Sequence, residues 1–379
     1  MSELKAVFMH SDEIERLHYP PHSPFKTERA GQTRSILRSM GLFEADGCIE
    51  TAPRPATDRE LLLFHKPEYL DALRRASLGE FKSDDLFMGI GTDDCPVFPD
   101  LFAYATLAAG ATIRGAELIL ENKTAIAFNP SGGYHHALAS EAGGFCYIND
   151  VVLGCMTLAQ KGKKVFCLDL DAHHGNGTQA AFYRDPSVFT VSFHESGKTL
   201  FPWGGFEHEI GEGDGRGYNV NVPLPAGTDD DIFTFAFREI VPPLLGAYKP
   251  DVIVLEIGMD ILSFDPLTHL SMTNNAIADT LPLLVKPQIP ILAVGGGGYN
   301  PEHTARGWAL AWTIFCGNEP DNDMTIGMGG MFLGSTEWSA GLRDGKIYAR
   351  GDEKETIRKQ VEQTVKKIRE TVFGIHGLS

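Results

Sequence analysis

Acidic and imidazole side chains follow two of the apolar segments of this sequence. Directly after Val165–Leu170 the chain reads DAHHGNG, and Asp171 and His173 stand two residues apart. On an extended turn their side chains can point the same way. Asp260 follows another apolar run, Val252–Ile257. Two carboxylates and one imidazole suit Zn²⁺, Fe²⁺ or Mn²⁺, and three protein ligands leave positions for water and substrate. We therefore predict a catalytic metal site at Asp171, His173 and Asp260, and the ligand types leave the choice among these three ions open.

Two adjacent histidines, His135 and His136, lie in a glycine-rich stretch after the apolar run Thr124–Phe128. Imidazoles beside a metal can take a proton from an attacking water and stabilise developing charge. Asp169 and Asn176 are placed to bond to the far ring nitrogens and so to fix the tautomers. Taken singly, each of these side chains could be a helix cap, a loop residue or a buried hydrogen-bonding group. The chemical interpretation is favoured because four apolar runs end in such residues.

Tyr299 follows a run of four glycines, Gly295–Gly298, at the end of a further apolar run. Glycines allow a backbone to approach a ligand closely, and we expect Gly297 to contact the substrate. A phenol at this position can donate a hydrogen bond to an oxyanion that develops during hydrolysis.

Short apolar runs rich in β-branched residues recur along the chain, and helical patterns such as Asp100–Leu120 and Asp150–Gln160 separate them. Continuous apolarity over five or six residues is typical of strands buried on both faces of a parallel sheet. The alternation predicts an α/β fold with helices on both sides of the sheet. Ligands of such sheets bind beyond the carboxyl ends of the strands. The predicted strands are Leu4–Met9, Thr124–Phe128, Val165–Leu170, Val188–Phe193, Val252–Ile257 and Ile291–Val294.

The last part of the chain contains one amphipathic pattern and one irregular stretch. Residues 353–373 place apolar side chains at steps of three or four, which predicts a helix that docks on the core. Residues 321–350 are rich in glycine and methionine without a period, and they could pack on the core or on a second copy of the chain. Since no linker divides the sequence, we expect one domain over residues 1–379, with its core at about 29–312.

The composition limits the class of protein. The chain has 379 residues, 43% of them hydrophobic, and a net charge of −17. Such an acidic chain is unsuited to direct binding of nucleic acid or anionic membranes, and it attracts cationic substrates. No apolar run reaches the ~18 residues of a membrane span, and the first residues do not resemble a signal peptide. We therefore expect a cytoplasmic enzyme.

No two of the six cysteines are spaced CxxC, and most lie in apolar runs, as expected for buried thiols.

These residues resemble a known family. The chain is similar to histone deacetylase-type metal-dependent amidohydrolases, a group that includes bacterial acetoin-utilization proteins and acetylpolyamine amidohydrolases. The resemblance runs from about Arg29 to about Trp312, and it implies the family's three-layer α/β/α arginase-like fold, with a mostly parallel sheet of about eight strands. The matching motifs are GGYHHA, GGFCYIND, DLDAHHGNGTQ, EIGMDILSFDP and GGGGYN.

The resemblance also implies roles for individual residues. It gives the predicted metal ligands, histidine pair and tyrosine the same roles as above, and it adds a substrate channel and a structural monovalent cation, usually K⁺. For the channel, it implies that Phe145 and Phe201 form an apolar tunnel and that the Gly144 carbonyl faces the substrate amide. It also implies that Asp94 binds the substrate backbone at the rim and that Arg29 binds the released acetate in the inner channel. For the cation, it implies ligands from Asp169, Ser192 and the carbonyls of Asp171, His173 and Phe193.

Two positions depart from patterns within the family. Asn176 stands where some branches have an aspartate behind the second histidine, which affects the proton affinity of His136. Leu267 stands where polyamine-selective members have an acidic residue. An apolar residue gives a distant second ammonium group no charge partner. The resemblance therefore implies an acylated lysine peptide or a small acyl-amine as substrate, with acetylpolyamines as the main alternative.

Two further functions are alternatives to deacetylation. An arginase-like ureohydrolase shares the fold, but it needs carboxylates for a second metal ion, and Gly175 stands where one of them is expected. A non-catalytic acyl-lysine binder would lack a metal ligand or the tyrosine, and this sequence has all of them.

Overall fold

The computed structural model describes residues 4–43, 47–317, 342–345 and 351–379. Within these residues, eight strands form one sheet in the order β2-β1-β3-β8-β7-β4-β5-β6, and every neighbouring pair is parallel. The predicted parallel α/β sheet is confirmed. The strands are β1 (Leu4–Met9), β2 (Cys48–Thr51), β3 (Thr124–Asn129), β4 (Val165–Asp169), β5 (Val188–Glu195), β6 (Asn219–Leu224), β7 (Val252–Glu256) and β8 (Ile291–Val294).

The six strands predicted from apolar runs are all present, with shifts at their ends of up to two residues. Two strands were not predicted. β2 is a short edge strand in which only Cys48 is buried, so it lacks a continuous apolar run. β6 is fully buried, but it contains Asn219 and Asn221, whose side-chain NH2 groups donate to Gln179 Oε1. Polar residues with tertiary partners can occupy a buried strand, and a hydrophobicity pattern does not detect them.

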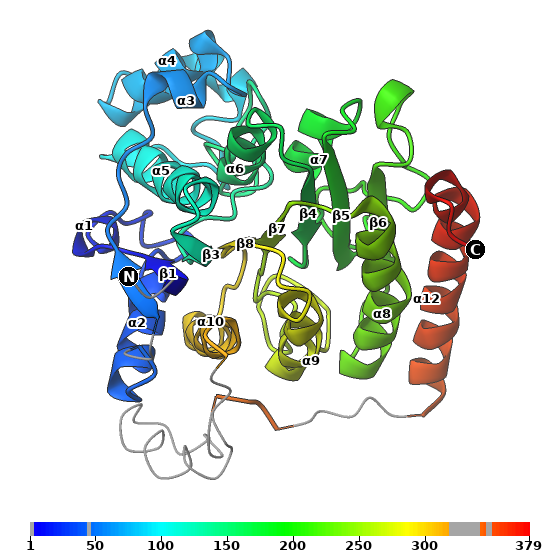
Figure 1. The fold of residues 1–379 in the computed structure, drawn as a ribbon. Coiled ribbons are helices and arrows are strands. Elements are labelled where there is room, and N and C mark those ends of the chain that lie inside the picture. The colour runs from blue at the N-terminus through cyan, green and yellow to red at the C-terminus, as the bar shows by residue number, and fades with distance from the viewer. Residues whose placement is uncertain (1–3, 44–46, 318–341, 346–350) are drawn as a thin grey trace.

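Helices cover both faces of the sheet, which gives the three layers implied by the resemblance (Figure 1). On one side lie α3, α4, α5, α6 and α7, and on the other lie α2, α8, α9, α10 and α12. The helices are α1 (Asp12–Glu15), α2 (Arg29–Ser39), α3 (Asp58–Leu61), α4 (Pro67–Ser77), α5 (Leu101–Leu120), α6 (Asp150–Ala159), α7 (Asn176–Phe182), α8 (Asp230–Tyr248), α9 (Asn274–Val285), α10 (Pro301–Phe315) and α12 (Gly351–Thr371), with short 3₁₀ turns at Ser83–Met88, Gly213–Gly215 and Phe373–His376.

The C-terminal helix follows its predicted pattern. In α12, Ile357, Val361, Val365 and Ile368 are buried, and the helix packs against α8 and β6. Most of the irregular stretch 321–350 lies outside the described residues. Within 342–345, Leu342 is buried in the core and Asp344 accepts a hydrogen bond from the amide of Asn274. The expectation of a single domain stays a prediction.

Four of the six cysteines are buried thiols, as predicted: Cys95, Cys146, Cys155 and Cys167. The other two differ, because Cys48 of β2 and Cys316 at the end of α10 form a disulfide across 268 residues of sequence. Their spacing gives no sign of this pair, since only the fold brings β2 close to the end of α10.

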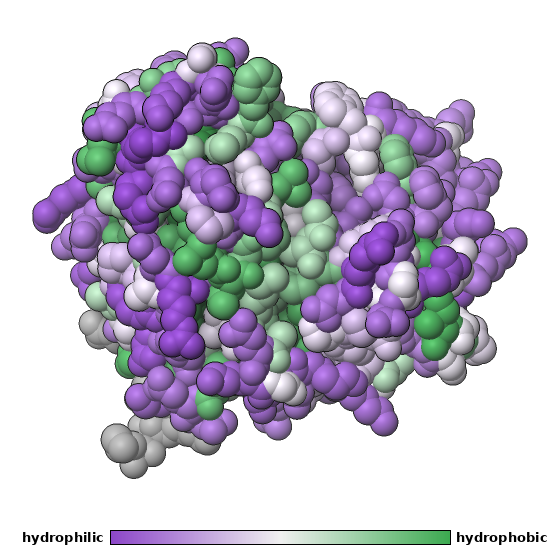
Figure 2. Space-filling model, turned by 90° about the horizontal axis from the view of Figure 1, so that it is seen from above, coloured by the Kyte–Doolittle hydropathy of each residue, from purple (hydrophilic) through white to green (hydrophobic). Residues whose placement is uncertain are grey.

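The face of the molecule in Figure 2 is predominantly hydrophilic. Seen from above, apolar residues gather toward the middle of the face, where the surface is hollowed, and hydrophilic residues surround them (Figure 2). Among the helices of the described residues, none combines the length and the apolarity that crossing a membrane requires.

Candidate functional site

Four neighbouring strands end at the same level of the sheet and carry the predicted site. In the paired registers, Asn129 of β3 lies beside Val294 of β8, Val294 beside Glu256 of β7, and Glu256 beside Asp169 of β4. The loops that follow these four strands contain both histidines of the pair, the tyrosine and all three predicted metal ligands. Because the strands are parallel and in register, residues more than a hundred positions apart meet at one edge.

The three predicted metal ligands converge. Suitable donor atoms of Asp171, His173 and Asp260 lie within 4.8 Å of one another, and all three residues are buried. His173 Nδ1 lies 2.9 Å from Asp260 Oδ2 and 3.2 Å from Asp171 Oδ1. Burial works against a charge on this imidazole, but hydrogen bonds to the two carboxylates outweigh it and raise the pKa of His173 to about 10. The pocket therefore favours a positive charge, and the donor set fits a divalent cation such as Zn²⁺.

The two carboxylates differ in their surroundings. Burial and the charge of Asp171 raise the pKa of Asp260 to about 7. For Asp171, burial acts in the same direction, but His135 and His173 outweigh it and lower the pKa below its usual range. Both side chains are also held by the backbone, since Asp260 Oδ1 accepts from the Ala172 amide at 2.9 Å and Asp171 Oδ1 from the His173 amide at 2.8 Å.

Gly297 lies against this metal-ligand set. Its amide donates to Asp171 Oδ2 at 2.6 Å, and a Cβ at this position would lie 2.0 Å from Asp260 Oδ2. The expected close backbone approach is therefore present, and it is directed at the two carboxylates. The predicted contact of Gly297 with substrate stays a prediction.

The two histidines form a bonded pair with the predicted partners. His135 Nε2 lies 3.2 Å from His136 Nε2. His135 Nδ1 lies 2.8 Å from Asp169 Oδ2, and His136 Nδ1 lies 2.8 Å from Asn176 Oδ1. Because Asn176 Oδ1 only accepts, the proton of a neutral His136 is on Nδ1, and its Nε2 carries the lone pair that can accept a proton.

The pKa values of the two imidazoles move in opposite directions. Burial, together with the charges of His135 and His173, lowers the pKa of His136 well below its usual range. Burial also opposes protonation of His135, but the charges of Asp169 and Asp171 outweigh it and raise its pKa. Two adjacent groups with opposite shifts are suited to acid and base roles.

Asp150, at the start of α6, was not identified from the sequence. Its buried carboxylate accepts from the amides of Gly133 and Tyr134 at 3.0 and 2.9 Å and from the Thr112 hydroxyl at 2.5 Å. It thus holds the loop directly before His135. A sequence signal existed, because Asp150 is an acid at the start of an otherwise apolar helix.

Tyr299 lies beside the metal-ligand set. Its ring centroid is 6.2 Å from that of His173 and 5.6 Å from that of Phe145. Burial, with the charge of Asp260, raises the pKa of the phenol well above its usual range, so the group remains a hydrogen-bond donor. Its backbone amide donates to Asp265 Oδ2 at 2.7 Å.

The two predicted tunnel phenylalanines lie on different sides of the reactive groups. Phe145 packs against Tyr299, and Phe201 packs against His136 with ring centroids 5.0 Å apart. The Phe145 carbonyl accepts from the buried Tyr19 hydroxyl at 2.7 Å. Two half-buried aromatic rings beside the histidines and the tyrosine are consistent with an apolar passage to the site.

Gly144 and Asp94 are linked to each other. The Gly144 amide donates to Asp94 Oδ2 at 2.8 Å, and the Thr92 hydroxyl donates to Asp94 Oδ1 at 2.7 Å. Gly144 has a φ of +52°, and a Cβ there would lie 2.3 Å from His136 Cδ2, so a side chain at this position would displace the imidazole. Asp94 therefore supports this loop, and its predicted contact with substrate stays a prediction.

Arg29 and Leu267 flank the tyrosine loop. Arg29 is buried between Phe25 and Trp308, and its Nη1 donates to the Gly298 carbonyl at 2.8 Å. Leu267 is half-buried, and its amide donates to Asp265 Oδ1 at 2.9 Å, so it shares this carboxylate with Tyr299.

The residues predicted to hold K⁺ also lie together. Asp169 and Ser192 are opposite each other in the register of β4 and β5, and both are buried. Phe193 follows in β5, and the chain from Asp171 to His173 follows β4. Buried oxygen atoms from a carboxylate, a hydroxyl and backbone carbonyls are the kind of ligands that hard cations prefer.

Glu256 was missed entirely. It is the last residue of β7, has no exposed surface, and places Oε1 3.2 Å from His135 Nδ1. Suitable atoms of His135, Asp169 and Glu256 lie within 4.8 Å of one another. The sequence signal was a charged residue at the end of the otherwise apolar run VIVLEI.

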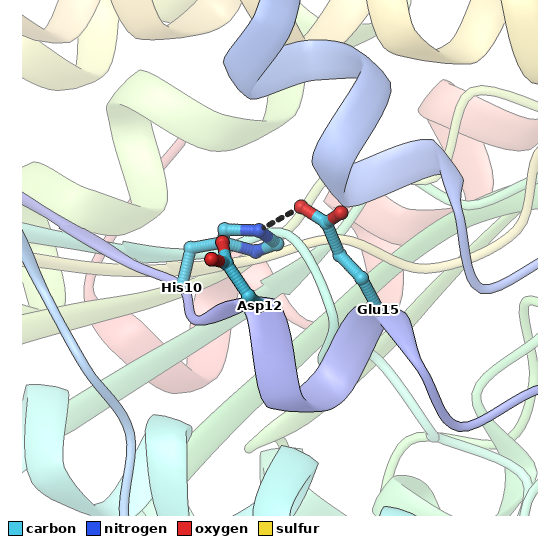
Figure 3. A group of neighbouring side chains, drawn as sticks. All are labelled: His10, Asp12 and Glu15. Atoms are coloured by element: carbon cyan, nitrogen blue, oxygen red, sulfur yellow. Dashed lines mark hydrogen bonds and ion pairs between the residues drawn. The ribbon is translucent and has the colours of Figure 1, made fainter.

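A second group with a possible ligand set lies away from these four loops. His10 follows β1, and Asp12 and Glu15 lie on α1 (Figure 3). His10 Nε2 already lies 2.5 Å from Glu15 Oε1, and Asp12 is exposed and lies 3.5 Å from Arg34. Because Asp12 is exposed and pairs with a cation, the set of Asp171, His173 and Asp260, all of which are buried, is the better candidate metal site.

Comparisons with known proteins identify a family. Residues 23–315 match the family model described as histone deacetylase domain. Histone deacetylase B of Dictyostelium discoideum is 36% identical over 326 residues, which are 85% of this chain and 76% of that protein. The acetoin utilization protein AcuC of Bacillus subtilis is 36% identical over 328 residues, which are 84% of each chain.

Solved structures show the same fold. An HDAC homologue from Aquifex aeolicus superposes with a TM-score of 0.82 at 32% identity, covering 94% of this chain and 100% of its own. An HDAC homologue complexed with SAHA superposes with a TM-score of 0.85 at 33% identity, covering 97% of this chain and 100% of its own.

Proposed function

The chain belongs to the histone deacetylase family, and from this premise we propose that it is a metal-dependent amidohydrolase that removes acetyl or other acyl groups from lysine-type amines. The observation that carries the proposal is the convergence of Asp171, His173 and Asp260 beside the bonded pair His135–His136. A cation site next to a proton-accepting imidazole is the arrangement that hydrolysis of an unreactive amide requires.

The metal ligands in this proposal are Asp171, His173 and Asp260, with Zn²⁺ as the preferred ion. When bound, the ion would supply Lewis acidity toward the acyl carbonyl and toward water. A structural K⁺ is proposed at Asp169, Ser192 and the carbonyls of Asp171, His173 and Phe193. It would offset part of the negative charge of the carboxylates buried in this region.

His136 accepts the proton of the attacking water. Its lowered pKa keeps the imidazole neutral near pH 7, and the hydrogen bond to Asn176 leaves Nε2 as the accepting atom. His135, held by Asp169, opposes lasting protonation of His136, so the pair can pass the proton on to the leaving group. This division of roles follows from their different surroundings.

Tyr299 donates its phenolic hydrogen to the oxyanion that develops on the acyl carbonyl. The water oxygen bonds to the acyl carbon as the carbonyl π bond opens, which gives the tetrahedral oxyanion. When the carbonyl re-forms, the C–N bond breaks, and the proton held by the histidine pair passes to the leaving nitrogen. The products are a free amine and a carboxylate. No covalent bond between the chain and the substrate forms, so no nucleophilic serine or cysteine is needed.

The proposed substrate is an acyl-lysine within a peptide or a related small acyl-amine. Phe145 and Phe201 offer apolar surface to the methylene chain of lysine. Leu267 offers no charge to the second ammonium of a polyamine. The negative net charge favours polycations at long range, which keeps acetylpolyamines as the alternative substrates. A homologue of similar fold binds SAHA, and this supports the same kind of channel here.

A substrate panel tests the proposal directly. Purified protein loaded with Zn²⁺ or Fe²⁺ is assayed on acetyl-lysine peptides, longer acyl-lysine peptides, acetylputrescine and acetylspermidine, and kcat/KM is compared. Peptide hydrolysis that disappears on chelation and returns with metal supports the proposal. Turnover of polyamines alone would select the alternative, and no amide hydrolysis with any loaded metal would refute it.

A further inference from the structure

Glu256 occupies an unusual place for a carboxyl group. It ends β7 in the middle of the sheet, with Asp169 of β4 on one side and Val294 of β8 on the other. It has no exposed surface, and among the described residues neither of its oxygens has a hydrogen-bond partner. Burying a polar group without partners costs roughly 1–3 kcal/mol in measured variants. The preceding residues of β7 are apolar and completely buried, so a leucine in this position would avoid that cost.

The unpartnered carboxyl group is aimed at the catalytic histidine pair. Glu256 Oε1 lies 3.2 Å from His135 Nδ1, while Asp169 Oδ2 lies 2.8 Å from the same nitrogen and receives its hydrogen bond. The Nδ1 edge of the ring therefore faces two carboxyl groups. Its other nitrogen, Nε2, lies 3.2 Å from His136 Nε2.

The backbone beyond Glu256 leaves little room for the carboxyl group to move. Gly296 has a φ of +123°, and a Cβ there would lie 3.1 Å from Glu256 Oε1 and 2.9 Å from Asp171 Oδ2. The backbone of Gly296 thus lies close to the Glu256 carboxyl group, and Asp169 and His135 are its other neighbours. The carboxyl group is therefore held beside the Nδ1 edge of His135, which it shares with Asp169.

We propose that Glu256 is a positioning residue for His135. Together with Asp169 it fixes the plane and tilt of the imidazole. Nε2 of His135 then faces His136 while the histidine pair takes a proton from water and passes it to the leaving nitrogen. This inference rests on the proposed function, because the alignment of His135 with His136 matters for amide hydrolysis. A side chain that keeps a polar atom at the Oε1 position preserves the alignment, and an apolar side chain of the same size does not.

The test compares Glu256→Gln with Glu256→Leu in the metal-loaded full chain, with kcat and KM measured on the best acyl-lysine peptide. Removal of groups that orient catalytic-site residues typically costs about 10–100-fold. We expect kcat of Glu256→Leu to fall in that range with KM unchanged, and kcat of Glu256→Gln to remain within about threefold of the native value. Glu195→Gln is the matched control. Glu195 is also a buried glutamate at the end of a strand, but its partners are Thr199 and His269. We expect this control to keep native kcat.

Two further readouts separate positioning from a structural role. Metal content of Glu256→Leu should match the native protein, and its melting temperature should be equal or higher, because leucine avoids the cost of burying an unpartnered carboxyl group. The ¹⁵N-histidine NMR spectrum of the loaded protein should show a shifted His135 Nδ1–H resonance in Glu256→Leu and a native one in Glu256→Gln. The resonance is identified by its loss in His135→Ala.

Several results would overturn the inference. Native kcat in Glu256→Leu would show that His135 needs no contact from Glu256, and a loss in both variants would show that a polar atom is not what matters. A loss accompanied by loss of metal or folding would assign Glu256 a structural role. Two tightly bound divalent ions per native chain, reduced to one in Glu256→Gln, would make it a metal ligand instead. The NMR comparison does not depend on turnover, so it still tests Glu256 if no acyl-amide is hydrolysed and the proposed function itself fails.

Discussion

The backbone amide of Tyr299 donates a hydrogen bond to the carboxylate of Asp265 across 2.7 Å. This bond ties the loop after β8 to the loop after β7. Because Asp265 also accepts from the Leu267 amide, one buried carboxylate positions both the proposed oxyanion donor and the proposed mouth of the channel.

Replacing Asp265 with asparagine should lower turnover without removing the metal. Asparagine replaces one of the two accepting oxygens with an NH2 group, which donates, so one of the two backbone amides loses its acceptor. We expect kcat to fall about tenfold or more, since small misplacements of a catalytic group cost up to about a hundredfold. Metal content should stay native. An equal loss of metal and activity would mean that Asp265 supports Asp260 and not Tyr299.

Tyr299→Phe should reduce kcat and leave metal binding intact. Removal of one oxyanion donor typically costs about a hundredfold to a thousandfold in rate. The phenyl ring keeps its packing against Phe145. Steady-state kinetics and metal analysis of the same preparation provide the check. A change below about threefold would show that the phenol does not contact the oxyanion.

Asp260→Ala should abolish both metal binding and activity. With three protein ligands, no other side chain replaces a lost one. Glu195→Gln again controls for removal of a buried carboxylate. Metal content is measured after dialysis against a weak chelator, followed by the peptide assay. Full occupancy with normal turnover in Asp260→Ala would contradict the ligand assignment.

Stability should fall as pH drops from about 6.5 toward 4, and His65 is one cause. Burial lowers the pKa of this imidazole from 6.5 to about 4, and its Nε2 accepts from the Asn149 amide at 3.0 Å. Between these pH values the unfolded chain binds a proton that the folded chain does not. The contribution of neutral His65 to the free energy of unfolding is therefore fully present above pH 6.5. It is lost on acidification, by up to about 3 kcal/mol.

His65→Gln keeps an oxygen that can accept the Asn149 amide but removes the titrating group. Thermal unfolding of native and variant proteins at pH 7.5 and pH 5 measures the effect. The difference in melting temperature between the two pH values should be smaller in the variant. An unchanged difference would show that His65 does not contribute to the acid sensitivity.

Leu267→Glu should shift preference toward acetylspermidine over acetyl-lysine peptides. The change in relative kcat/KM should correspond to about 1 kcal/mol, the scale of a partly exposed charge pair. The long-range field of the acidic chain is screened beyond about 8 Å at physiological salt, so the residue at the mouth decides. Leu267→Gln controls for polarity without charge. Native protein that prefers acetylputrescine to every peptide would place the specificity determinant elsewhere.

The amino-acid sequence by itself determined which residues can do chemistry and after which strands they lie. Asp171 and His173 are neighbours along the chain, so their shared direction is a local property. The apolar runs before them, and before Asp260 and Tyr299, predict buried parallel strands. Parallel strands bring their carboxyl ends to one edge whatever the length of the connections, and the aligned ends of β3, β8, β7 and β4 confirm this expectation.

Only the tertiary structure decided how those residues are supported. Glu256 lies in an apolar run, and its contact with His135 depends on the pairing of β7 with β4 and on the path of a separate loop. Asp150 holds the His135 loop from the start of a helix, and Cys48 meets Cys316 across 268 residues. Burial and hydrogen bonding of a polar side chain depend on which distant segments pack around it, and a pattern along the chain does not contain that information.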